Sequence, residues 1–143
     1  MKTIHLLRVD GDAETFAPLV RAAAELGLRV GWLELTEPEA PPSLARAAEA
    51  GVLRAVAAGS RRTVAVKDRR GPTVLVDLLR EHFGGCRAVL VRGEIEAPRV
   101  DASQVEGPGE GWRVSAGAVT LDLSTEQLAA RLRCPRPWSD PEP

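Results

Sequence analysis

The hydrophobic and polar positions in the first two thirds of the chain alternate between two patterns. Short, mostly apolar runs are typical of buried strands. These runs are found at 3–9, 29–35, 52–58, 63–67 and 88–91. Between them, apolar residues recur at helical spacing, which predicts helices that open near Thr15, Pro42 and Gly71. This order predicts an α/β protein with a mainly parallel sheet covered on both faces.

Two of the expected helix starts depend on prolines. With Thr15 as the N-cap, Pro18 falls at the third helical position, where its missing N–H costs nothing. Pro72 likewise belongs to the first turn of a helix that Gly71 and Thr73 help to open. The segment between the strand-like runs 52–58 and 63–67 is read as either a hairpin turn or a simple bend.

The C-terminal third has a different character. Residues 97–111 are polar and rich in turn formers, which predicts an adaptable loop rather than part of the core. Alternating residues over 112–115 and 118–123 then predict a hairpin with one solvated face. The Ser-x-x-Gln sequence at 124–127 is a capping box for a helix over 125–133.

The last ten residues, 134–143, contain four prolines and can be neither a helix nor a central strand. We expect Trp138 to hold this tail against its own domain, since burying an indole offsets part of the ordering cost. The sequence therefore predicts one small α/β domain over 1–133, followed by a Pro-rich tail. Its expected layering is Rossmann-like or flavodoxin-like, with the C-terminal hairpin and helix added.

Composition excludes several classes of protein. The net charge of −1 gives no bulk attraction to nucleic acid or to anionic lipid. The two cysteines are too few for a disulfide framework or a four-cysteine zinc site. No apolar run reaches the roughly 18 to 20 residues of a membrane span, and the N-terminus lacks the pattern of a signal peptide. We therefore expect a cytoplasmic protein without a membrane or nucleic-acid partner.

The strongest local signal for a binding site follows the strand-like run 63–67. Basic residues and a glycine there lead into an expected helix N-terminus, where free N–H groups favour an anion. Two arginines can form a fork around a phosphate or carboxylate, and Arg61 and Arg62 are candidates for the same patch. The predicted ligand-binding residues are Lys67, Arg69, Arg70, Gly71 and Thr73. The chain contains neither of the glycine-rich phosphate motifs, G-x-x-x-x-G-K-[ST] and G-x-G-x-x-G.

A second set of residues supports an enzymatic alternative. Asp10 and Asp12 follow the first strand, and Thr36, Lys67 and Glu94 follow later ones in that order. In this order the chain resembles haloacid-dehalogenase-like phosphatases. The resemblance implies a carboxylate nucleophile, a general acid and a Mg²⁺ site at Asp10 and Asp12. The chain departs from that family after Asp12 and lacks its Gly-Asp pair after the strand 88–91.

No complete catalytic set is visible in the sequence. His5 lies inside the first strand and is expected to be a packed residue, while His82 is expected at a helix C-terminus, where its cation is favoured. We therefore favour a non-catalytic binding or interaction module for a small anionic ligand. The alternatives are the Mg²⁺-dependent phosphoryl-transfer enzyme and a structural subunit that forms a homo-oligomer, or binds a protein partner, through its hairpin edge.

Overall fold

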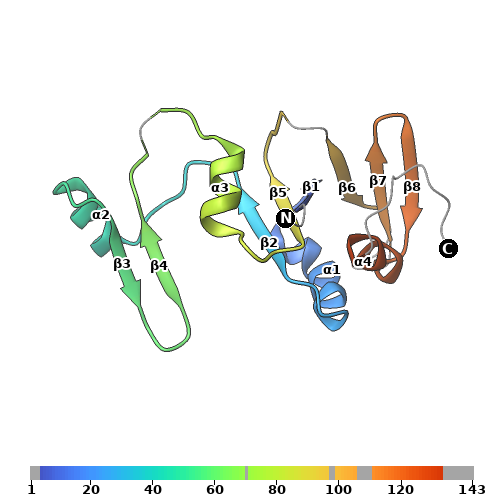
Figure 1. Cartoon of the computed structure of the whole chain (residues 1–143), viewed down its shortest axis with the longest axis horizontal. Helices are drawn as coiled ribbons and strands as arrows, with labels where there is room; N and C mark the ends of the chain where they lie inside the picture. Colours follow the sequence, from blue (N-terminus) through green and yellow to red (C-terminus); the bar gives the residue numbers. More distant parts are fainter. Residues whose placement is uncertain (1–3, 70, 97–98, 106–110, 134–143) are drawn as a thin grey trace. The chain divides into compact units, whose positions relative to one another are not determined.

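The structure of the chain is a computed structural model, which describes residues 4–69, 71–96, 99–105 and 111–133. The chain divides into two compact units (Figure 1). The larger unit comprises Met1–Leu35 and Leu75–Pro143, and the smaller one Thr36–Val74. The expected single domain over 1–133 stays a prediction, and the tail with Trp138 lies outside the described residues.

The larger unit is built on a six-stranded sheet with the order β2-β5-β1-β6-β7-β8 (Figure 1). Its strands are β1 (His5–Val9), β2 (Val30–Glu34), β5 (Ala88–Arg92), β6 (Val100–Gln104), β7 (Trp112–Ala116) and β8 (Val119–Leu123). The first four strands in the sheet order are parallel, and β7 and β8 add an antiparallel hairpin. The mainly parallel α/β sheet with a C-terminal hairpin is therefore confirmed.

Helices cover both faces of this sheet, because β5 is apolar on both of its sides. Leu90 packs in a cluster with α1 (Ala13–Glu25) and α4 (Thr125–Arg133). Its neighbours Val89 and Val91 point to the other face and meet α3 (Leu75–His82). A strand buried on both faces has a continuous apolar sequence, as A-V-L-V does here.

The approach of Phe83 to β2 explains a glycine inside that strand. A Cβ atom at Gly31 would lie 2.4 Å from the Phe83 ring, far closer than a van der Waals contact. Gly31 therefore lets the residue that follows α3 pack directly against the strand.

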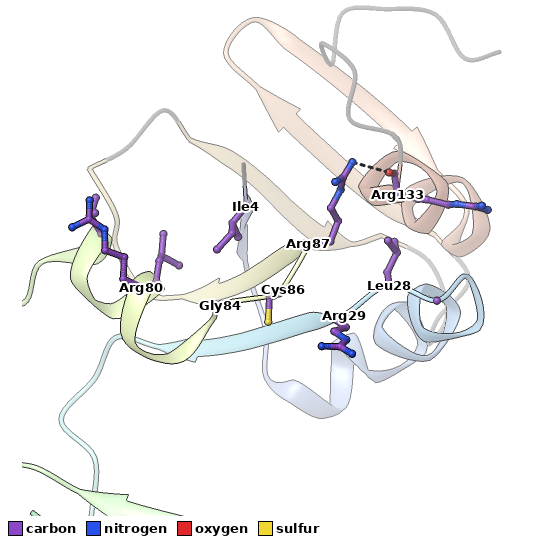
Figure 2. A pocket seen from close by; sticks show the side chains of 12 residues that line it. Ile4, Leu28, Arg29, Arg80, Gly84, Cys86, Arg87 and Arg133 are labelled. Atoms are coloured by element: carbon purple, nitrogen blue, oxygen red, sulfur yellow. Dashed lines mark hydrogen bonds between the residues drawn. The ribbon is translucent and has the colours of Figure 1, made fainter. Parts of the chain in front are cut away.

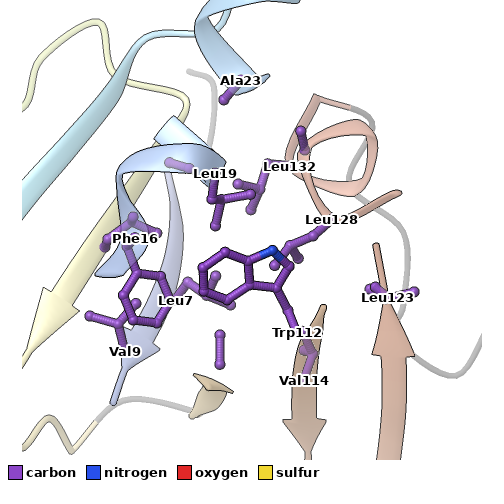
Figure 3. Packing of buried hydrophobic residues seen from close by; sticks show 14 residues of the cluster. Leu7, Val9, Phe16, Leu19, Ala23, Trp112, Val114, Leu123, Leu128 and Leu132 are labelled. Atoms are coloured by element: carbon purple, nitrogen blue, oxygen red, sulfur yellow. The ribbon is translucent and has the colours of Figure 1, made fainter. Parts of the chain in front are cut away.

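The core of the larger unit is centred on Trp112, which has no exposed surface (Figure 3). Its ring centroid lies 4.8 Å from that of Phe16 in α1. Its indole N–H donates a hydrogen bond of 2.9 Å to the hydroxyl of Thr125, the first residue of α4. Leu7 of β1 and Leu128 of α4 belong to the same cluster. The indole thus has both apolar contacts and a polar partner, as a buried Trp requires.

The start of α1 differs from the expectation. Its N-cap is Asp12 rather than Thr15, and Pro18 lies inside the helix. The Asp12 carboxylate accepts hydrogen bonds from the Thr15 N–H at 2.9 Å and from the Thr15 hydroxyl at 2.8 Å. Pro18 cannot donate to the carbonyl of Glu14, a loss that we infer is offset by this cap and by the buried face of the helix.

The expected loop over 97–111 contains a strand. Residues Val100–Gln104 form β6, which pairs with β1 on one side and β7 on the other. Its sequence, V-D-A-S-Q, has only one strongly buried side chain, that of Ala102. The prediction of a loop was therefore wrong for this part, and residues 97–98 and 106–110 lie outside the described residues.

The smaller unit holds α2 (Pro42–Glu49) and a two-stranded antiparallel sheet of β3 (Ala55–Ala58) and β4 (Thr63–Val66). The segment between these strands is thus a hairpin turn, closed by a hydrogen bond of 2.9 Å from the Gly59 N–H to the Arg62 carbonyl. The helix expected to open at Gly71–Thr73 begins only at Leu75.

Two further expectations concern helices. The capping box is confirmed, since the Ser124 N–H donates to the Gln127 side chain at 2.8 Å and the Gln127 N–H to the Ser124 hydroxyl at 3.1 Å. Within the described part of the chain, every helix is too short or too polar to cross a membrane.

We expect Trp112→Ala to lower the free energy of unfolding by about 3 to 5 kcal/mol, because it leaves a cavity between α1 and α4. Trp112→Phe keeps a ring beside Phe16 and should cost less. Trp32→Ala is the matched control, because Trp32 is only half-buried. Urea unfolding of the three variants measures the effect, and an equal loss for both alanine variants would contradict the central role of Trp112.

Candidate functional site

The carboxyl ends of the parallel strands form the edge at which ligands bind in open α/β sheets. β1 and β5 are neighbours there, and Asp10 and Asp12 follow β1 while Glu94 follows β5. The structure therefore puts these three predicted residues at the same edge of the sheet. What each carboxylate contacts decides what this edge can do.

Asp12 is engaged with its own helix. Its two hydrogen bonds from the Thr15 N–H and hydroxyl lower the pKa of this carboxyl group, and attraction to Arg92 lowers it further. The carboxylate thereby takes a position at the α1 N-terminus that would otherwise attract an anionic ligand.

Glu94 forms ion pairs with two arginines, Arg8 and Arg99, that were not predicted as site residues. Arg8 of β1 contacts Glu94 at 2.8 Å and Asp101 of β6 at 3.3 Å, and its Nε donates to the Gly93 carbonyl at 3.1 Å. Arg99 contacts the same two carboxylates, at 3.0 and 3.2 Å. Arg8 lies 86 and 93 residues from these carboxylates along the chain, so its pairing has no local signal in the sequence, and its contact with Asp101 depends on β6 lying beside β1.

The metal site of the enzymatic alternative has no support from this arrangement. Asp12 caps α1, and Glu94 lies between two guanidinium groups. Among the residues that the structure describes, no three His, Cys, Asp or Glu side chains are placed to hold a metal ion. Mg²⁺ at Asp10 and Asp12 stays a prediction.

The segment predicted to bind an anion belongs to the smaller unit. Lys67 and Arg69 are exposed just after β4, and Arg70 lies outside the described residues. Gly71 has a φ of +84°, which favours glycine, and a Cβ atom there would meet nothing within 4 Å. Thr73 is also exposed.

One detail of the predicted anion site is wrong. α3 begins at Leu75 and falls in the larger unit, so its N-terminus does not directly follow the basic segment. Arg61 and Arg62 lie before β4, and Lys67 after it. That these basic residues form one patch stays a prediction.

Comparison with solved structures identifies proteins of the same fold. The crystal structure of Bacillus subtilis MobB has a TM-score of 0.50 and 18% identity, covering 72% of this chain and 69% of that one. A crystal structure of molybdopterin-guanine biosynthesis protein B (mobB) has a TM-score of 0.51 and 15% identity, covering 72% and 71%. No family model and no curated protein matches the sequence.

At such low identity the likeness to MobB shows the fold alone, a small α/β domain with a mainly parallel sheet. A phosphate-binding P-loop needs a lysine and free backbone N–H groups at the first strand–helix turn. In this chain that turn carries Asp10, Asp12 and Glu14 and no basic residue. The first strand–helix turn of this chain therefore offers a phosphate group no basic side chain.

We expect Asp12→Ala to lower the melting temperature, while Asp12→Asn should retain most of it because Asn is also a good N-cap. The advantage of Asp over Asn should be present above the ordinary pKa of 3.8 and disappear as the pH falls through the lowered folded value. Thermal unfolding by circular dichroism at neutral and acidic pH measures this. Asp10→Ala is the control, and an equal effect at both positions would contradict the capping role.

His5 generates a separate pH prediction. Burial lowers the pKa of its imidazole, and the positive charge of Arg87 lowers it further. Below the ordinary imidazole pKa of 6.5, the unfolded chain binds the proton more readily than the folded one. The free energy of unfolding therefore decreases as the pH is lowered. His5→Gln should reduce the loss of melting temperature between pH ~7 and pH ~5, and His82→Gln should not. Identical slopes for wild type and His5→Gln would refute this.

Proposed function

We propose that this chain is a non-catalytic α/β module that binds a small anionic ligand. The observation that supports the proposal is that two carboxylates at the carboxyl edge, Asp12 and Glu94, are engaged by the chain's own groups. Asp12 accepts two hydrogen bonds from Thr15, and Glu94 is paired with Arg8 and Arg99. A phosphoryl-transfer enzyme needs such carboxylates free for a metal ion or for substrate.

The proposed ligand contacts are the basic residues after β4. Lys67 and Arg69 are exposed there, and the backbone at Gly71 is open to an approaching molecule. With Arg70 and Thr73, these groups offer three charged donors and a hydroxyl to a phosphate or carboxylate. A protein of the same fold is named for molybdopterin-guanine biosynthesis, which makes a guanine nucleotide a suitable first probe.

Two accompanying proposals follow from the same picture. The first is that the module works in the cytoplasm. The second is that the chain forms a homo-oligomer, or binds a protein partner, through β8, the last strand of the sheet. Neither is needed for ligand binding.

We expect GDP to bind in isothermal titration calorimetry and the double variant Lys67→Ala/Arg69→Ala to weaken it roughly tenfold, because exposed charge pairs contribute modestly. The control is Arg61→Ala/Arg62→Ala, which removes the same charge from the other end of β4. Equal weakening by both double variants would mean a diffuse charge effect. Release of phosphate from GTP by the pure protein would overturn the non-catalytic function.

A further inference from the structure

A groove of about 1100 Å³ lies at the opposite, amino-terminal edge of the parallel strands (Figure 2). The residues that precede three strands line it: Ile4 before β1, Arg29 before β2 and Arg87 before β5. The ends of α1, α3 and α4 border the same groove. Its volume matches or exceeds that of typical small-molecule sites, about 300 to 1000 Å³. It lies at the end of the sheet opposite to the carboxyl edge, and its lining residues all belong to the larger unit.

The groove carries a strong excess of positive charge. Its lining contains Arg29, Arg80, Arg87 and Arg133, and none of the described lining residues is Asp or Glu. Three helix C-termini contribute about half a negative charge each. These partial charges neutralise less than half of the four guanidinium charges. The field in the groove therefore favours an anion.

The arginines come together through the pairing of the strands. The Arg87 N–H donates to the Arg29 carbonyl at 2.8 Å, so these residues start from adjacent positions at the sheet edge. Arg87 extends toward α4, where its Nη2 donates to the Arg133 carbonyl at 3.3 Å. The Arg29 guanidinium lies beside Gly85 at the end of α3, 3.7 Å from where a Cβ would be.

Arg87 also has an unmet hydrogen-bonding requirement. Its Nε is fully buried and has no hydrogen-bond partner among the described residues. A buried, charged N–H without an acceptor costs free energy, and such groups in native proteins call for an explanation. Among the described residues, Arg87 therefore uses only part of its hydrogen-bonding capacity, through its Nη2.

The centre of the groove is apolar. Ile4, Leu28 and Cys86 lie between the labelled arginines in Figure 2. Val76 and Leu79 of α3 extend this surface, and Val76 is 53% exposed. Apolar surface surrounded by guanidinium groups matches a molecule that has both an apolar body and an anionic group.

We propose that this groove is a binding site for a small amphipathic anion, a phosphate, sulfonate or carboxylate attached to an aromatic or aliphatic body. The apolar body contacts Ile4, Leu28 and Leu79, and the anionic group pairs with the surrounding arginines. The site is independent of the residues after β4, so either one can fail without the other.

The test uses the full chain and two fluorescent probes of similar shape. Anilinonaphthalene sulfonate carries the anion, and phenylnaphthylamine lacks it. We expect the sulfonate to bind with saturation and at least tenfold more tightly than the neutral probe. Arg29→Ala/Arg80→Ala removes two exposed arginines of the groove and should weaken the sulfonate roughly tenfold. Arg21→Ala/Arg46→Ala, which removes two exposed arginines outside it, should change the affinity less than twofold.

The position of the bound probe is checked through Cys86. In a Cys134→Ser variant Cys86 is the single remaining thiol. Saturating sulfonate should then slow its alkylation by iodoacetamide several-fold. Equal affinity for the two probes, unchanged affinity in Arg29→Ala/Arg80→Ala, or an unprotected Cys86 would each overturn the proposal.

Discussion

Trp112 joins two parts of the chain that differ in strand direction. It opens the antiparallel hairpin β7–β8, yet its ring packs on Phe16 of α1 and its N–H bonds to Thr125 of α4. The parallel strands and the hairpin therefore share one buried cluster on this face of the sheet. α1 and α4 also pack on each other directly, so Trp112 completes a cluster that joins the hairpin to both helices.

The pairing of β6 between β1 and the hairpin also determines which charges meet at the carboxyl edge. β6 lies between β1 and β7, and this brings Asp101 beside Arg8. Arg8 then reaches Glu94, and Asp12 turns back on its own helix. Asp12 and Glu94 at this edge thus have partners within the protein.

The amino-terminal edge of the parallel strands, in contrast, has an excess of positive charge. Arginines collect where the parallel strands begin and three helices end, and the buried Nε of Arg87 lacks a partner among the described residues. Helix C-termini favour nearby cations, which gives some of these arginines a structural role as well. The four arginines carry more positive charge than the three helix ends offset, so the net field at this edge favours an anion.

Local patterns in the sequence determined most of the elements: the continuous apolar run of β5, the helical spacing in α1 and the capping box before α4 depend on neighbours within a few residues. Two predictions were wrong because they used local sequence alone. β6 is too polar to be recognised by itself and is a strand because it pairs on both sides, and Pro18 sits inside α1 because the cap and the core outweigh its lost hydrogen bond. Only the tertiary structure decided which charges meet. Arg8 with Asp101 and Arg29 with Arg87 are far apart in the chain and come together through strand pairing, which leaves no spacing in the sequence to find.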